Sequence, residues 1–299
     1  MIDVTTLTSL SSTLENDPMA PIDAYSISCL VSNKNIYPAH RALAAKARIR
    51  HIYGASTYHR INPLRTPSPI CKLCNTGEET QGHILGSCKA EIIQAMILKR
   101  HGTAIGKIVD AIQSSTKLGN CAAFVDAEGG DRSARTTTNI PWCPQAPMLF
   151  DETGILHHSS LPDIILFPKI DSKYISDASF RPTSTQKEIT LLDITYTDDT
   201  TVKNRYQEKL DHHNPYYTHL IALGWRVKLY PIVLTYSGCV SASIRSFLDQ
   251  DCGLTATAIN TLIKSLQQHS YRYNSKLSST RSFQLKKLIT NLQNPTGVG

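Results

Sequence analysis

Long apolar segments are missing from this sequence. No uninterrupted hydrophobic run approaches the roughly 18–20 residues that a membrane-spanning helix needs, so we expect a soluble protein with no membrane partner. The chain also shows no lipidation motif, no internal repeat and no apolar signal segment at its start. Its eight cysteines are therefore not expected to form the disulfide framework of a secreted protein. A hydrophobic content of 41% with 18% charged residues is typical of a globular protein with a core.

Acidic residues are scarce between positions 34 and 107. This stretch holds 12 Lys and Arg against three acids, Glu78, Glu79 and Glu91, and 12 − 3 gives a net charge of +9. The whole chain carries +7, so the remainder sums to 7 − 9 = −2. A positive charge concentrated in this way indicates a surface that binds the phosphates of a nucleic acid.

Four soft metal ligands lie inside the same basic stretch. Cys71, Cys74, His83 and Cys88 follow the spacing C-x2-C-x8-H-x4-C. Three thiolates and one imidazole complete a tetrahedral zinc site with no open position, which predicts a structural metal. The alternative is a group of ordinary buried cysteines beside a solvated histidine, and the short C-x2-C spacing favours zinc.

Hydrophobic periodicity and turn residues predict an α/β core with mixed strand pairing. Residues 113–148 are expected to form a loop, and the polar stretch 168–187 an insertion. Pro231 should restrict the last strand to an edge or a bend. The helices are expected at 40–56, on either side of Gly102, at 202–213 and 217–223 around a break at Asn214-Pro215, at 255–269 and at 279–292; the strands are expected at 162–167, 188–196 and 225–235.

Two aspartates lie in apolar strand segments, where an unpaired charge costs several kcal/mol. Asp163 follows a proline at the start of its strand, and a role as a turn or cap residue is equally open for it. Asp193 lies between Leu192 and Ile194, where Asp is uncommon. Two carboxylates on adjacent strands can share a Mg²⁺ ion, and Lys209 on the following helix could return its ammonium group to that site.

The order of these motifs resembles the restriction-like PD-(D/E)XK endonuclease of site-specific non-LTR retrotransposons. In that family a CCHC zinc knuckle precedes an Arg-His pair, and Arg100-His101 occupy that place here. The resemblance covers about residues 40–253. It implies a restriction-endonuclease-like mixed sheet flanked by helices, with an upstream zinc knuckle and a basic helical arm.

The resemblance also assigns the site residues. Asp163 and Asp193 would bind the catalytic Mg²⁺ or Mn²⁺, and Lys209 would be the catalytic lysine displaced onto a helix. The strict motif places a lysine two residues after the second acid, where this chain has Thr195. The 30 residues between the two aspartates fit the motif if 168–187 is a surface insertion.

The activity that the resemblance implies is a metal-dependent hydrolase that nicks target DNA and exposes a 3′-hydroxyl for target-primed reverse transcription. The implied partners are the DNA target, element RNA and a reverse transcriptase domain upstream in the same polyprotein, and the implied location is the nucleus. The competing hypothesis is a catalytically inactive zinc-knuckle module that only binds nucleic acid. Such a module would have no need of Asp193 or Lys209.

We divide the chain into an N-terminal segment without an assigned role (1–33), a basic helical arm and linker (34–69, the basic arm), the zinc knuckle (70–93), the endonuclease domain (94–253) and C-terminal helices (254–299). The pairs His157-His158 and His212-His213 lie in polar surroundings and are expected to be solvated. The expected nucleic-acid contacts are Arg41, Lys46, Arg48, Arg50, Arg100 and His101.

Overall fold

The computed structural model describes residues 22–32, 37–125, 140–144, 148–150, 156–158 and 161–293. The first 21 residues of the expected N-terminal segment, and the side chains of His157 and His158, lie outside this description. The main helices are α2 (Ala24–Ser32), α3 (Pro38–Arg48), α4 (Ala55–Ile61), α5 (Glu91–Gln113), α6 (Val202–Ala222), α7 (Ala242–Ser246) and α8 (Ala256–Gln293). The strands are β1 (Cys121–Val125), β2 (Met148–Phe150), β3 (Leu156–His158), β4 (Ile164–Asp171), β5 (Glu188–Thr197) and β6 (Arg226–Thr235).

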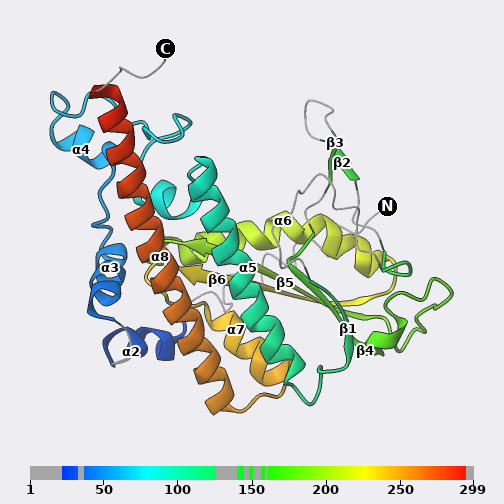
Figure 1. The fold of residues 1–299 in the computed structure, drawn as a ribbon. Coiled ribbons are helices and arrows are strands. Elements are labelled where there is room, and N and C mark those ends of the chain that lie inside the picture. Colours follow the sequence, from blue (N-terminus) through cyan, green and yellow to red (C-terminus); the bar gives the residue numbers. More distant parts are fainter. Residues whose placement is uncertain are drawn as a thin grey trace.

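A four-stranded mixed sheet lies at the centre of the protein (Figure 1). The strand order is β1-β4-β5-β6, with antiparallel β1–β4 and β4–β5 pairs and a parallel β5–β6 pair that α6 connects. The prediction of an α/β protein with a mixed sheet flanked by helices is confirmed. Pro231 lies in β6 at the edge of this sheet, as expected for a residue without a backbone N–H.

The two faces of the sheet are covered by different helices. Residues that alternate along a strand point to opposite faces. On one face Leu192 and Ile194 of β5 join a core with Ile105 of α5 and with residues of α7 and α8. On the other face Leu191 packs with Tyr216 of α6. Strand β5 is therefore buried on both sides, so a charged side chain within it requires a compensating partner.

The predicted break between two C-terminal helices is absent, because α8 is continuous for 38 residues. The predicted gap contains Tyr271, Asn274 and Leu277, all of them buried, and it holds no Gly or Pro. Tertiary burial therefore sustains the helix where the apolar pattern weakens. Figure 1 shows α8 crossing the same face of the molecule as α5, with α3 beside it, and Ala44 of α3 packs on Tyr271.

Other expected boundaries also differ from the structure. Helix α5 passes through Gly102, and α6 continues through Pro215, whose ring removes one backbone hydrogen bond from an otherwise intact helix. Helix α3 ends at Arg48, before the expected limit of residue 56. Strand β1 lies within the stretch 113–148 predicted to be a loop, so that prediction is wrong for these residues. The segment contains two alanines and has a weak strand propensity of its own, and it forms a strand by pairing with β4.

The zinc knuckle lies where α5 begins, and it contacts both α5 and α8. Its third candidate ligand, His83, begins a short helix, η1 (His83–Ser87), which ends directly before Cys88, the fourth. Within the described ranges, no helix has the length and apolar character needed to cross a membrane.

Candidate functional site

The four predicted zinc ligands come together in the structure. The ligand atoms of Cys71, Cys74, His83 and Cys88 all lie within 4.8 Å of one another. The Sγ atoms of Cys71 and Cys88 are 4.0 Å apart, and Sγ of Cys74 is 3.3 Å from Nε2 of His83. Two sulfurs on a tetrahedral zinc would be about 3.8 Å apart, given a Zn–S bond of about 2.3 Å. The predicted Cys/His cluster is therefore confirmed as one that could bind a metal such as zinc.

The chemistry of these donors also fits a cation. Burial raises the pKa of the Cys88 thiol to about 12, and repulsion from Cys71 and Cys74 acts in the same direction. Burial also acts to raise the pKa of Cys74, but hydrogen bonds from Thr76 and from the backbone amide of Lys89 outweigh it and lower the pKa to about 6. Thiolates packed this closely repel one another, and a bound cation removes that repulsion.

A buried ion pair attaches the zinc knuckle to α8. Arg281 pairs with Glu79, and the two side chains are only 5% and 8% exposed. The same guanidinium lies 3.8 Å from Sγ of Cys71. Leu277 of α8 and Ile93 of α5 pack against the cluster as well. The knuckle is therefore fixed to the helices that cover the sheet.

Asp163 and Asp193 lie side by side at the end of the β4–β5 ladder. Ile164 pairs with Leu192, so the antiparallel register places Asp163 next to Asp193 on the neighbouring strand. The two residues are 8% and 4% exposed. Oδ2 of Asp163, the residue directly before β4, accepts a hydrogen bond of 2.6 Å from the backbone N–H of Ile194 in β5. The Asp163 carboxylate therefore acts as a cap, because it accepts a hydrogen bond from a backbone N–H of β5 that lies beyond the paired residues of β4.

Two cationic or imidazole groups of α6 reach Asp193. Nζ of Lys209 lies 2.7 Å and Nε2 of His213 lies 3.1 Å from Oδ2 of Asp193. Burial acts to raise the pKa of Asp193, but His213 and Lys209 outweigh it and hold this pKa well below its usual range. Asp193 is therefore an ionised carboxylate in the core, stabilised by two partners from one helix.

His213 is completely buried, so the expectation that it is solvated is wrong. Its neighbour His212 is exposed, in line with that expectation. The sequence held a signal for this arrangement, because Arg205, Lys209 and His213 recur at intervals of four and share one face of α6. That face is the one that meets β5.

His101 joins the acidic pair from α5. Its Nε2–H donates a 2.8 Å hydrogen bond to the carbonyl of Ile194 and lies 3.4 Å from Oδ2 of Asp163. Burial acts to lower the pKa of His101, but Asp163 outweighs it and the pKa is raised. Burial raises the pKa of Asp163, which His101 partly opposes. His101, expected to contact nucleic acid, is thus part of the acidic site itself.

Arg100, the other half of the expected Arg-His contact, lies in the interior. Its side chain is 1% exposed, and its guanidinium donates a 2.6 Å hydrogen bond to Asn274 and stacks 4.0 Å from the centre of the Tyr196 ring. Burial lowers the pKa of this guanidinium. We therefore remove Arg100 from the expected phosphate contacts, because its donors are used in fastening α5 to α8 and β5.

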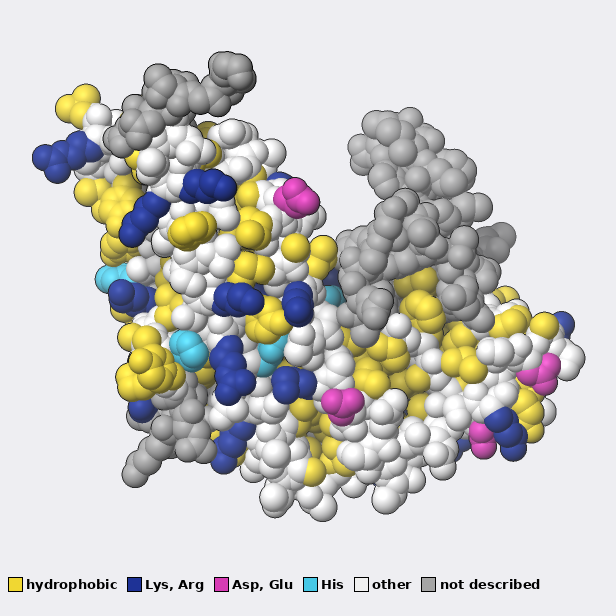
Figure 2. All heavy atoms as spheres, viewed as in Figure 1, with side chains coloured by type: hydrophobic (Ala, Val, Ile, Leu, Met, Phe, Trp, Pro, Cys, Tyr) yellow, Lys and Arg dark blue, Asp and Glu magenta, His cyan; other side chains and the backbone are white. Residues whose placement is uncertain are grey.

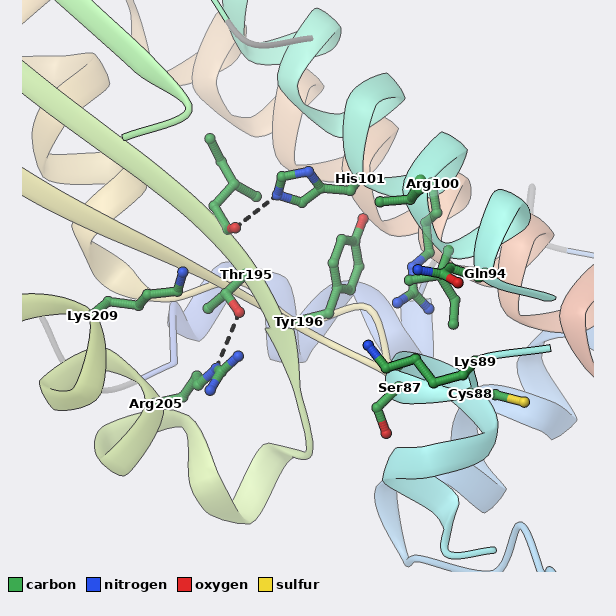
Figure 3. A pocket seen from close by; sticks show the side chains of 14 residues that line it. Ser87, Cys88, Lys89, Gln94, Arg100, His101, Thr195, Tyr196, Arg205 and Lys209 are labelled. Atoms are coloured by element: carbon green, nitrogen blue, oxygen red, sulfur yellow. Dashed lines mark hydrogen bonds between the residues drawn. The ribbon is translucent and has the colours of Figure 1, made fainter. Parts of the chain in front are cut away.

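A cleft of about 660 Å³ extends from the zinc knuckle to His101 and Lys209, the residues that contact Asp163 and Asp193 (Figure 3). Lys89 lies on its knuckle side, and Arg205 and Lys209 lie on its α6 side. Ile194, Thr195 and Tyr196 of β5 form the part between them. The cleft thus leads from the candidate zinc site to the lysine that contacts Asp193.

The basic arm reaches the end of β5. Nε of Arg48 lies 3.8 Å from Asp199, and a guanidinium nitrogen of Arg50 lies 3.5 Å from Asp198. The two arginine side chains are 40% and 60% exposed, whereas their aspartate partners are 11% exposed, so the guanidinium groups stay open to a phosphate from solvent. Arg41 is half-buried and Lys46 is exposed on α3. The arm residues are therefore accessible, and two of them are weakly paired.

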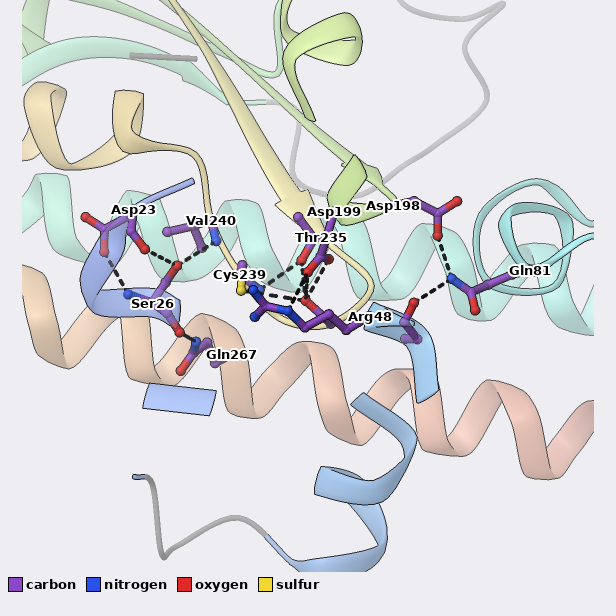
Figure 4. A network of polar contacts seen from close by, with 12 residues as sticks. Asp23, Ser26, Arg48, Gln81, Asp198, Asp199, Thr235, Cys239, Val240 and Gln267 are labelled. Carbon is purple, nitrogen blue, oxygen red and sulfur yellow. Dashed lines mark hydrogen bonds and ion pairs between the residues drawn. The ribbon is translucent and has the colours of Figure 1, made fainter. Parts of the chain in front are cut away.

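Gln81 of the zinc knuckle connects the arm to the sheet (Figure 4). Its Nε2 donates to the carbonyl of Ala47 at 2.8 Å and to Oδ1 of Asp198 at 2.6 Å. Its Oε1 accepts from the backbone N–H of Ile52 at 3.3 Å. One buried amide thus fixes the arm, the knuckle and the end of β5 to one another.

The C-terminal helix extends the basic surface beyond the predicted stretch. Helix α8 contains no Asp or Glu, and besides the buried Arg281 it carries five exposed basic residues, Lys264, Arg272, Lys276, Lys286 and Lys287. Figure 2 shows Lys and Arg side chains spread over the half of this face that α3, α4 and α8 occupy, with few acidic side chains among them. The sequence alone indicates no role for this helix.

Comparison with known proteins adds no family assignment. No protein-family model matches the chain, and a search of curated proteins finds no similar sequence.

Proposed function

We propose that the protein is a metal-dependent DNA endonuclease, built on a restriction-like core with a structural zinc site. The observation that carries the proposal is the group formed by Asp163, directly before β4, Asp193 in the adjacent strand β5, and Lys209 on the following helix. Burying two neighbouring carboxylates is unfavourable unless a cation or another function compensates it. The order of acid, acid and lysine along the chain is the one that the retrotransposon endonuclease resemblance implies.

The carboxylates of the acidic pair are suited to a hard cation. All four contacts described above for Asp163 and Asp193 use their Oδ2 atoms. We assign the Oδ1 atoms to a Mg²⁺ or Mn²⁺ ion, for which paired carboxylates are suitable ligands. Bound there, the ion would supply an activated water and neutralise charge on the scissile phosphate.

The chain's own groups have separate roles in this proposal. Lys209 lies at the cleft wall and keeps Asp193 ionised, and its ammonium can interact with a phosphate that enters the cleft. His213 holds the Asp193 carboxylate from the buried side, and His101 holds Asp163 through the end of β5. These two histidines are positioning residues, since both contact the carboxylates from within the protein.

The proposed biological role, location and partners rest on the same resemblance to the retrotransposon endonuclease. We propose that the nick exposes a 3′-hydroxyl that primes reverse transcription in the nucleus, and that a reverse transcriptase domain of the same polyprotein and the element RNA are partners. The basic arm and α8 would hold the DNA by its phosphates.

End-group analysis of nicked DNA tests the reaction type. Supercoiled plasmid incubated with zinc-loaded protein and Mg²⁺ should give nicked circles that a DNA polymerase extends without prior end repair, because hydrolysis leaves a 3′-hydroxyl. Nicks that require phosphatase treatment before extension would contradict the proposed hydrolysis. A protein that binds the plasmid and never nicks it would support the inactive binding module.

A further inference from the structure

The cleft between the zinc knuckle and β5 has walls of one charge. Its lining includes Lys89, Arg205, Lys209 and His101, and within the described part of the chain no acidic residue lines it. Asp193, the nearest carboxylate to Lys209, lies behind the wall at 4% exposure. A space bounded by cations attracts an anionic ligand.

The cations extend into the cleft from opposite sides. Figure 3 shows Lys89 reaching from the knuckle towards β5, while Arg205 and Lys209 reach from α6. Nε of Arg205 donates to Oγ1 of Thr195 at 3.1 Å, and its NH1 lies 2.6 Å from Glu208, so its guanidinium is oriented before any ligand arrives. Lys89 directly follows Cys88, so metal binding at the knuckle fixes the backbone from which it projects.

Apolar side chains complete the lining. Ile97 and Leu98 of α5 line the same space. Sites for single-stranded nucleic acid combine a cationic groove for the backbone with apolar or aromatic surface for unstacked bases. The exterior of a duplex presents phosphates and leaves its base faces inside, so it would make no use of this apolar surface.

The size of the cleft agrees with one strand. Its volume of about 660 Å³ is within the roughly 300–1,000 Å³ of small-ligand sites. Such a space admits a short part of one chain at a time. A duplex, whose major groove alone is about 12 Å wide, would rest on the rim.

We propose that this cleft binds a single strand of DNA, with Lys89 and Arg205 contacting phosphates on its two walls and the strand directed towards Lys209. The proposal rests on the proposed function for the identity of the polymer. It adds that the DNA is unpaired where it reaches the acidic site, and that the zinc knuckle supplies one wall of the binding site.

Equilibrium binding of a labelled 20-nucleotide oligo(dT) tests the proposal without cleavage. The variant is Lys89→Ala with Arg205→Ala, measured on zinc-loaded protein in a buffer with no added Mg²⁺ or Mn²⁺. The matched control is Lys72→Ala with Lys203→Ala, which removes the same charge from the same two elements. Lys72 and Lys203 are exposed outside the cleft, and Lys203 lies about 200° around α6 from Arg205.

The double variant should bind oligo(dT) at least about tenfold more weakly than the control pair does. Its log–log salt dependence should be flatter by about 1.4, because each lost phosphate contact on a single strand accounts for about 0.7. The affinity of the double variant for a hairpin duplex of the same length should fall by a smaller factor. Zinc content and far-ultraviolet circular dichroism confirm that each variant is folded.

Any of three results would contradict the proposal that the cleft binds a single strand. These are equal losses for the two variant pairs, an equal loss for duplex and single strand, and no measurable binding of oligo(dT) by the wild type. The plasmid assay remains a separate readout. If the wild type nicks plasmid but the double variant binds oligo(dT) normally, the proposed function stands and the proposed single-strand site is wrong. If the wild type does not nick plasmid but the double variant binds oligo(dT) more weakly, the single-strand site stands and the proposed endonuclease function is wrong.

Discussion

Nζ of Lys209 lies 2.7 Å from Oδ2 of Asp193, although 209 − 193 = 16 residues separate them in the sequence. The contact arises because α6 follows β5 and packs back on the face of the sheet to which Asp193 points. A lysine two residues after Asp193 would lie on that same face of the strand. Thr195 occupies that position instead, and Arg205 of α6 donates to its hydroxyl. The helix thus supplies the cation that the strand lacks.

The cysteine cluster predicts one zinc ion per molecule. Cys71→Ser or His83→Ala should lose the metal, because each removes one of four ligands. Cys121→Ala is the matched control, since this cysteine lies in β1, outside the cluster. Metal content measured by atomic emission on purified proteins decides this, with circular dichroism as a check on the sheet and helices. A zinc-free wild type from zinc-replete expression would disprove the site.

The buried pair between Arg281 and Glu79 should be important for stability. Arg281→Met leaves Glu79 buried without its partner and should lower the free energy of unfolding by about 3–5 kcal/mol. Arg226→Met is the control. The Arg226 side chain is 71% exposed where it pairs with Glu188, so its replacement should lower the free energy of unfolding by less than about 1 kcal/mol. Urea unfolding followed by fluorescence measures both. Similar losses would show that the knuckle is not attached through this pair.

His213 should influence cleavage through the metal site. His213→Gln should lower the nicking rate about 10- to 100-fold and raise the Mg²⁺ concentration needed for half-maximal rate, as loss of a carboxylate's supporting partner does. DNA binding should stay unchanged. His212→Gln, at the exposed neighbouring position, should resemble the wild type. A lower rate with an unaltered Mg²⁺ dependence would limit His213 to a packing role.

The basic arm should contribute phosphate contacts on duplex DNA. Arg48→Ala with Arg50→Ala should weaken binding similarly across sequences and flatten the log–log salt slope by up to about two units. Lys173→Ala with Arg181→Ala is a control with the same charge change between β4 and β5. Affinities measured over a range of salt concentrations give the slopes. Slopes identical to the wild type would mean that Asp198 and Asp199 keep the two arginines from the DNA.

The sequence predicted the parts of this site that have a local signature. The spacing of Cys71, Cys74, His83 and Cys88 is short-range, so their clustering could be predicted, and apolar runs rich in β-branched residues predicted strands β4, β5 and β6. Long-range packing could not be foreseen. The burial of Arg100 depends on Asn274, which is 174 residues away, and the cleft depends on the position of the knuckle relative to α6. The continuity of α8 depends on tertiary burial in the same way.

Plasmid nicking by Asp193 variants tests the central claim most directly. Zinc-loaded wild-type protein should convert supercoiled plasmid to nicked circles with Mg²⁺ or Mn²⁺. Asp193→Asn and Asp193→Ala should do so at least about a hundredfold more slowly while they bind the same DNA with unchanged affinity, because the cation loses a ligand and the phosphate contacts remain. Lys209→Ala should also cut the rate severely, with the fold intact. Nicking at the wild-type rate by both the Asp193 and Lys209 variants would contradict the account.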